Sequence, residues 1–171
     1  MRPSRAKQFG GFFFSLVACT ASAFAQELPK GWHVPASNLT RQDFRRKDPT
    51  HFLTVIGDFD GDGVKDRAVL LVNEKLTQMG LFVCLSTPTG CNWHRLEAME
   101  IGFLDVMGIV KAPPGKYETA CGKGYWECEK DEPKLLVTKR AAIEFFKDES
   151  ASSLYIYDPK RHAFKAIATS D

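Results

Sequence analysis

Apolar residues in most of the chain recur in short runs of strand length, separated by turn residues. The runs are rich in valine, isoleucine, leucine and phenylalanine, a composition that favours strands over helices. We expect strands at residues 52–56, 68–72, 81–85, 91–96, 135–138, 153–157 and 162–168, the last at a sheet edge. Two segments stay open, because residues 102–110 fit a strand or a bend and residues 141–146 fit a strand or a helical turn.

One short helix is expected before the first of these strands, over residues 41–46. Asn38 or Thr40 can cap this helix, and a proline at position 49 ends it. The basic run at residues 45–47 is predicted to be a solvated face, with docking of an acidic partner as the alternative. Because the remaining elements are consecutive strands joined by turns, we predict an α+β fold that is mainly antiparallel β, with one or two short helices.

The first 25 residues have the organisation of a secretory signal peptide. A basic start precedes an apolar run at residues 9–18, and Ala23-Phe24-Ala25 offers a cleavage site. The sequence around Cys19 also resembles a lipoprotein box, in which Cys19 would carry a lipid anchor, so both processing routes stay open. No later stretch reaches the roughly 20 apolar residues of a membrane-spanning helix. We expect residues 26–171 to form a single compact domain in the periplasm or outside the cell.

Removal of the predicted signal peptide changes the charge balance. The whole sequence has 23 basic and 21 acidic residues, a formal net charge of +2. Three basic residues and no acidic residue lie in the first 25 positions, so residues 26–171 carry a formal charge of −1. A nearly neutral chain argues against a nucleic-acid-binding protein, which would show a basic patch or stripe.

Four of the five cysteines lie after the predicted signal peptide, in two pairs with six residues between the members of each pair. An even number of cysteines in an exported chain indicates disulfides, and four cysteines allow three connectivities. We predict Cys84–Cys91 and Cys121–Cys128, because each bond closes a short local loop and stabilises the fold by about 2.5 kcal/mol. A zinc site is the alternative, although zinc knuckles usually have a closer spacing.

Four aspartates lie within nine residues: Asp58, Asp60, Asp62 and Asp66. Carboxylates about 5 Å apart repel by roughly 3 kcal/mol at an effective dielectric near 20, so a cation is expected among them. Together with the carbonyl of Val64, the four aspartates have the spacing of calcium-loop ligands. Oxygen ligands favour calcium over zinc or copper. An acidic solvated turn without an ion is the alternative.

The flanks of this acidic segment distinguish it from an EF-hand. Val69 stands where an EF-hand has a bidentate glutamate, and strands rather than helices are expected on both sides. The segment resembles the calcium-binding loop of FG-GAP and VCBS-type repeats over about residues 52–72. The resemblance implies calcium coordination by Asp58, Asp60, Asp62, Val64 and Asp66, in families that are largely extracellular and ligand-binding. It extends to the loop only, since the repeats that build a propeller are absent.

No catalytic constellation is recognisable. The sequence has no nucleophile elbow, no His-Glu-x-x-His and no phosphate loop, and its four histidines are scattered. Tyr125 and Trp126 lie between two cysteines and are predicted to form a rigid aromatic binding loop, with packing into the core as the alternative.

These features favour an exported, calcium-stabilised, non-catalytic binding protein of the bacterial envelope. We expect its partner to be another envelope or secreted protein, as for an inhibitor or immunity protein. A carbohydrate- or surface-binding adhesive module and a small metal-dependent hydrolase are the alternatives.

Overall fold

The computed structural model describes residues 27–40 and 45–171. The predicted signal peptide, Cys19 and residues 41–44 of the predicted helix lie outside the described residues. The elements, in chain order, are β1 (Trp32–His33), the 3-10 turn η1 (Ser37–Leu39), β2 (Thr54–Gly57), β3 (Asp66–Asn73), β4 (Gln78–Thr87), β5 (Gly90–Glu100), the 3-10 turn η3 (Ile101–Asp105), β6 (Met107–Ala112), β7 (Gly115–Glu118), β8 (Leu135–Thr138), β9 (Ala142–Lys147), β10 (Ser152–Asp158) and β11 (Ala163–Ser170).

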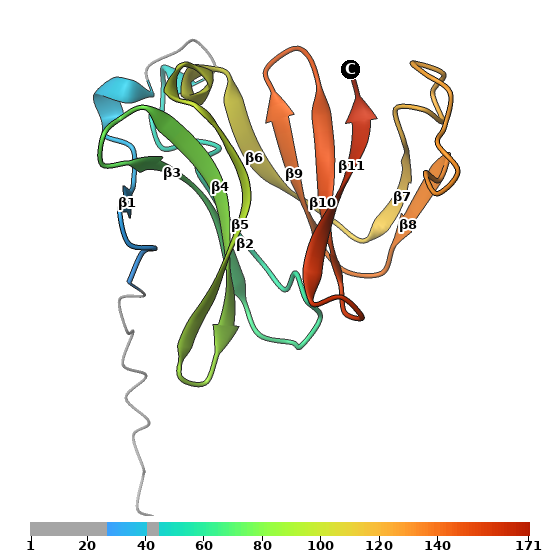
Figure 1. Cartoon of the computed structure of the whole chain (residues 1–171), viewed down its shortest axis with the longest axis horizontal. Helices are drawn as coiled ribbons and strands as arrows, with labels where there is room; N and C mark the ends of the chain where they lie inside the picture. Colours follow the sequence, from blue (N-terminus) through green and yellow to red (C-terminus); the bar gives the residue numbers. More distant parts are fainter. Residues whose placement is uncertain (1–26, 41–44) are drawn as a thin grey trace, which may run out of the picture.

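The strands form two main antiparallel sheets. The first sheet has the order β1-β3-β4-β5, with β2 also paired to β3, and the second has the order β11-β10-β9-β6. Strands β7 and β8 form a separate two-stranded sheet. Figure 1 shows the first sheet beside the second, with β7 and β8 beyond the second sheet. The two main sheets are joined where β2 comes close to β6, and the amide of Ile109 donates to the carbonyl of Phe52 at 2.9 Å.

The hydrophobic core lies between the two main sheets, because alternate residues of each strand point to the same face. Its largest buried members include Leu70, Met79, Leu81, Ile109 and Ile143. A second cluster covers the outer face of the first sheet, where Trp32 packs edge-on against Phe82 at 4.7 Å between ring centroids. Strand β3 is therefore buried on both faces, which accounts for the continuous apolar run in its sequence.

The prediction of a mainly antiparallel β fold is confirmed, but the prediction of short helices is not. Among the described residues, the helical elements are 3-10 turns, with η1 and η3 spanning three and five residues. The open segment 102–110 divides into most of η3 and most of β6, and the open segment 141–146 lies in β9 except for its first residue. The long connection between β7 and β8, residues 119–134, is folded by a disulfide and by turn hydrogen bonds in place of a helix.

The prediction of a solvated basic run at residues 45–47 is wrong for Arg45, whose side chain is completely buried. Its guanidinium donates to the carbonyls of His51 at 2.9 Å and Leu104 at 2.6 Å, and also to that of Met107. Carbonyls at the end of a short 3-10 turn lack partners within the turn and need a donor from elsewhere. Burial lowers the pKa of Arg45 to about 10, so the side chain stays charged at neutral pH.

Both predicted disulfides are present. Cys84–Cys91 closes the hairpin of β4 and β5, and Cys121–Cys128 closes a loop between β7 and β8, with Cα–Cα distances of 5.4 and 4.9 Å. Structural disulfides persist in oxidising compartments, which indicates a location outside the cytoplasm. In residues 27–40 and 45–171 we find no helix with the length and apolar character needed to cross a bilayer.

Candidate functional site

The acidic segment forms the loop that joins β2 to β3. Asp66, the first residue of β3, is buried, and its carboxylate accepts hydrogen bonds from the amides of Phe59 at 2.8 Å and Ser86 at 2.9 Å. The Phe59 side chain lies fully buried in the core between the two sheets. The loop is therefore anchored at both ends, by an apolar side chain and by a buried carboxylate.

Three of the four predicted carboxylate ligands converge. One oxygen from each of Asp58, Asp60 and Asp66 lies within 4.8 Å of the other two. Burial raises the pKa of Asp66, and the charge of Asp60 adds to this effect, while the amides of Ser86 and Phe59 oppose it. Oxygen ligands in this arrangement fit a hard cation such as calcium.

Asp62 lies outside this group of three. Its side chain is exposed, and its carboxylate accepts from the amide of Val64 at 2.7 Å. The Val64 side chain is also exposed, so any role in coordination belongs to its carbonyl group. Gly61 and Gly63 both have positive φ, +85° and +88°, which allows the backbone to turn tightly around the carboxylates.

The aspartates also hold the loop in shape through its own amides. Asp58 accepts from Gly61 at 2.7 Å and from Gly63 at 3.0 Å, and Asp60 accepts from Asp62 at 3.1 Å. These are the local side-chain-to-backbone bonds that aspartate forms in turns. Asp58 and Asp60 are thus positioned by amides of the loop itself, whereas Asp66 also depends on the amide of Ser86 in β4.

Arg140 joins the loop to the second sheet and was not predicted from the sequence. It lies in the connection between β8 and β9, and its guanidinium donates to the carbonyl of Asp60. A Cβ placed on Gly61 would lie 3.0 Å from the guanidinium carbon, so the two residues are in close contact. Since 80 residues separate Arg140 from Asp60, no local pattern could have indicated this contact.

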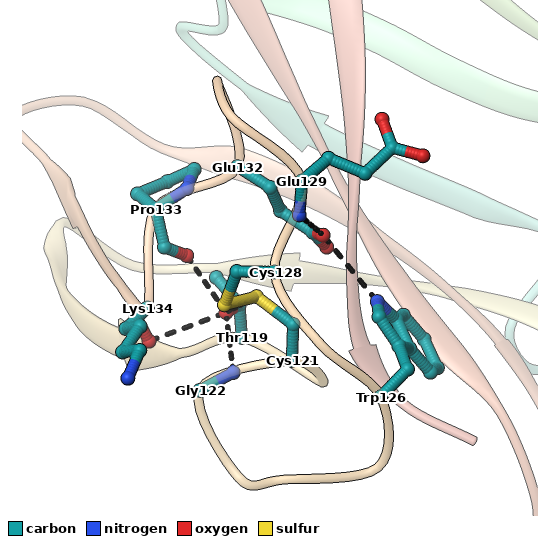
Figure 2. The surroundings of a disulfide bond; sticks show 9 residues. All are labelled: Thr119, Cys121, Gly122, Trp126, Cys128, Glu129, Glu132, Pro133 and Lys134. Atoms are coloured by element: carbon teal, nitrogen blue, oxygen red, sulfur yellow. Dashed lines mark hydrogen bonds between the residues drawn. A yellow bond between two sulfur atoms is a disulfide. The ribbon is translucent and has the colours of Figure 1, made fainter.

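The loop closed by Cys121 and Cys128 is held firmly at its base (Figure 2). The hydroxyl of Thr119 donates to the carbonyls of Pro133 at 2.7 Å and Lys134 at 3.2 Å, and it accepts from the amide of Gly122 at 3.1 Å. Two further bonds reach β11, one from the amide of Ala120 to Ala168 and one from the ammonium group of Lys123 to Thr169. The loop is therefore a fixed part of the domain surface.

Tyr125 and Trp126 project from this loop and do not pack into the core. Their exposed fractions are 54% and 40%, so both count among the exposed large apolar side chains in the described part of the chain. The indole N–H of Trp126 donates to Glu132 at 3.3 Å, which restricts the orientation of the ring (Figure 2). Of the two predicted alternatives for these aromatic residues, the structure favours the exposed one.

Trp126 lines two depressions, of about 440 and 620 Å³. Carboxylates dominate the polar lining of the smaller one, which contains Glu129, Asp131 and Glu132 with Lys165 as the single cation. An exposed indole ring beside carboxylates is suited to a cationic side chain, which can interact with the ring face and the acids together.

Two polar residues of β5 face the interior of the fold. Glu97 accepts a hydrogen bond of 2.7 Å from the hydroxyl of Tyr155, and burial raises the pKa of Tyr155. Burial also lowers the pKa of His94, whose ring lies near Phe164. The Glu97–Tyr155 pair joins the two sheets, so its evident role is structural.

In comparisons of the whole chain with known proteins, no protein-family model, curated protein or solved structure matches this chain.

Proposed function

We propose that the protein is an exported, non-catalytic binding protein of the bacterial envelope that recognises another envelope or secreted protein. The observation that carries this proposal is the exposure of Tyr125 and Trp126 on a loop fixed by a disulfide and by Thr119. Aromatic side chains that are already ordered lose little conformational entropy on binding, and tryptophan is prominent among the residues that dominate interface energies.

The charge around Trp126 supports a basic partner surface. Glu127, Glu129 and Asp131 are exposed, and Glu132 is held beside the indole by a hydrogen bond. A lysine or arginine of the partner that reached this acidic rim would gain both Coulomb attraction and contact with the ring. The partner class proposed here is therefore a protein with a basic, protruding segment.

We further propose that calcium occupies the loop between β2 and β3 and stabilises the fold. Convergence of Asp58, Asp60 and Asp66 within 4.8 Å supports this assignment. Asp62 and the carbonyl of Val64 complete the ligand set that the resemblance to FG-GAP loops implies. The ion would neutralise repulsion among the carboxylates and hold the turn against Asp66 at the start of β3.

The binding proposal is tested by affinity capture from envelope extract, followed by titration of the purified captured protein. Trp126→Ala should weaken binding by about 2 kcal/mol, the cost typical of an interface hot spot. Phe103→Ala is the matched control, because Phe103 is an aromatic residue of η3 with a similar exposed fraction of 43%.

Equal binding by wild type and Trp126→Ala would contradict the proposal that the surface around Trp126 binds the partner protein. Trp126-dependent binding on a glycan array, without capture of a protein, would instead favour the carbohydrate-binding alternative.

A further inference from the structure

A cleft of about 560 Å³ opens beside the acidic loop, where β2 and β6 end and the two main sheets meet. Its walls come from three separate parts of the chain, namely the acidic loop, the segment after β6 and the connection between β8 and β9. A cleft of this size falls in the range of small-molecule sites.

The lining of this cleft is strongly cationic. Four basic side chains, Lys65, Lys111, Lys139 and Arg140, face it together with one carboxylate, that of Asp58. All three lysines are exposed, and within residues 27–40 and 45–171 none of them forms an ion pair with a carboxylate. Like charges around one hollow raise the local positive potential and favour an anion with several charges.

Arg140 gives the cleft a fixed cation, while the lysines supply adaptable ones. The guanidinium of Arg140 is held by the Asp60 carbonyl and by contact with Gly61. The aliphatic part of Lys111 lies over Gly57, since a Cβ added to Gly57 would be 3.3 Å from Lys111 Cδ. A planar guanidinium and compact ammonium groups are the side chains that best bind phosphate oxygens.

We propose that this cleft binds a phosphate-bearing small molecule or headgroup that carries at least two negative charges. A single carboxylate would leave most of the positive charge unneutralised, whereas a phosphate group can contact several cations at once. The site is separate from the surface around Trp126, because the two share no lining residue. It therefore adds a ligand site to the proposed protein-binding function and does not depend on it.

The test is isothermal titration with inorganic pyrophosphate in calcium-free buffer, because pyrophosphate itself binds calcium. Wild type should bind, and its affinity should fall as salt is raised, since the cations are exposed. The triple variant Lys65→Gln, Lys111→Gln, Lys139→Gln should bind at least about tenfold more weakly, given the energies typical of exposed charge pairs. A triple Lys→Arg variant at the same positions should retain binding, and melting curves would show that all variants fold.

A matched triple control separates the cleft from the net charge of the protein. It replaces three exposed lysines that do not line the cleft: Lys75→Gln, Lys130→Gln and Lys160→Gln. This control should stay within about twofold of wild type, because distant exposed charges are screened. Failure of wild type to bind pyrophosphate, or an equal loss in the two glutamine variants, would overturn the proposal.

Vesicles distinguish the two sources of phosphate. Phosphatidylcholine vesicles containing phosphatidic acid are compared in co-sedimentation with vesicles of phosphatidylcholine alone. Sedimentation that requires phosphatidic acid and the three cleft lysines would support a lipid headgroup as the ligand. Pyrophosphate binding without sedimentation would support a soluble phosphorylated ligand.

Discussion

Asp60→Asn should change stability in opposite directions with and without calcium. The converging oxygens of Asp58, Asp60 and Asp66 lie within 4.8 Å of one another. At that upper limit each pair of charges repels by about 0.9 kcal/mol at a dielectric of 80 and about 3.5 kcal/mol at 20. The substitution removes two of the three repulsions, and the asparagine oxygen can still accept from the amide of Asp62. In calcium-free buffer we therefore expect the variant to be more stable than wild type by about 1–2 kcal/mol.

Calcium should reverse this order. At a calcium concentration of about 100 times its dissociation constant, wild type should gain about 2.7 kcal/mol. For a domain of this length, that gain corresponds to a rise of about 5–10 °C in melting temperature. The variant lacks one carboxylate ligand and should gain much less stability. Without calcium the variant should therefore have the higher melting temperature, and with calcium wild type should have the higher one.

Differential scanning calorimetry in calcium-free, calcium and magnesium buffers measures this reversal of order. Asp131→Asn is the control, because Asp131 is an exposed aspartate on the surface near Trp126, and it should respond to calcium like wild type. A wild-type melting temperature that calcium leaves unchanged would refute the calcium site. A variant less stable than wild type without calcium would refute the repulsion argument.

Three further predictions concern the rest of the fold. Arg45→Met should lower the free energy of unfolding in urea by about 3–5 kcal/mol, because buried carbonyls lose a charged donor. Burial lowers the pKa of His94, so below about pH 6.5 the unfolded chain binds more protons than the folded protein. Stability should therefore fall as pH drops through this value, and His94→Gln should reduce the fall. Replacing Cys84 and Cys91 together by alanine should cost about 2.5 kcal/mol.

The outcomes that would contradict these predictions differ. An unchanged urea midpoint in Arg45→Met would mean that the arginine is not needed to satisfy the carbonyls. If the stability of His94→Gln fell with decreasing pH as much as that of wild type, other titrating groups would be the cause. A double cysteine variant as stable as wild type would mean that the disulfide adds no stability to the hairpin of β4 and β5.

The strands could be predicted because their signals are local. Runs such as residues 68–72, bounded by turn sequences, carry enough β-branched and apolar residues to identify strands without knowledge of their partners. The disulfides were predictable for the same reason, since each joins cysteines seven positions apart. The helix predicted over residues 41–46 lies mostly outside the described residues and stays a prediction.

The candidate sites were predictable only where one segment supplies them. Asp58, Asp60 and Asp66 lie in one loop, so their spacing indicated their convergence. The burial of Arg45 and the contact of Arg140 with Asp60 depend on pairing between distant strands, which a single sequence does not reveal. For Trp126 the sequence predicted an aromatic binding loop but left packing into the core open, because that choice depends on which elements cover the second sheet. Tyr117 and Leu136 of β7 and β8 pack there instead.

The contact between Arg140 and the carbonyl of Asp60 has a consequence for how the protein opens. It connects a loop of the first sheet to the segment that leads into β9 of the second, and Phe59 of that loop enters the core. Ordering of this loop should therefore make the two sheets exchange their amide protons as one cooperative unit. If the loop loosens, β6 and β9 should open separately, and their amide protons should exchange while those of the first sheet stay protected from exchange.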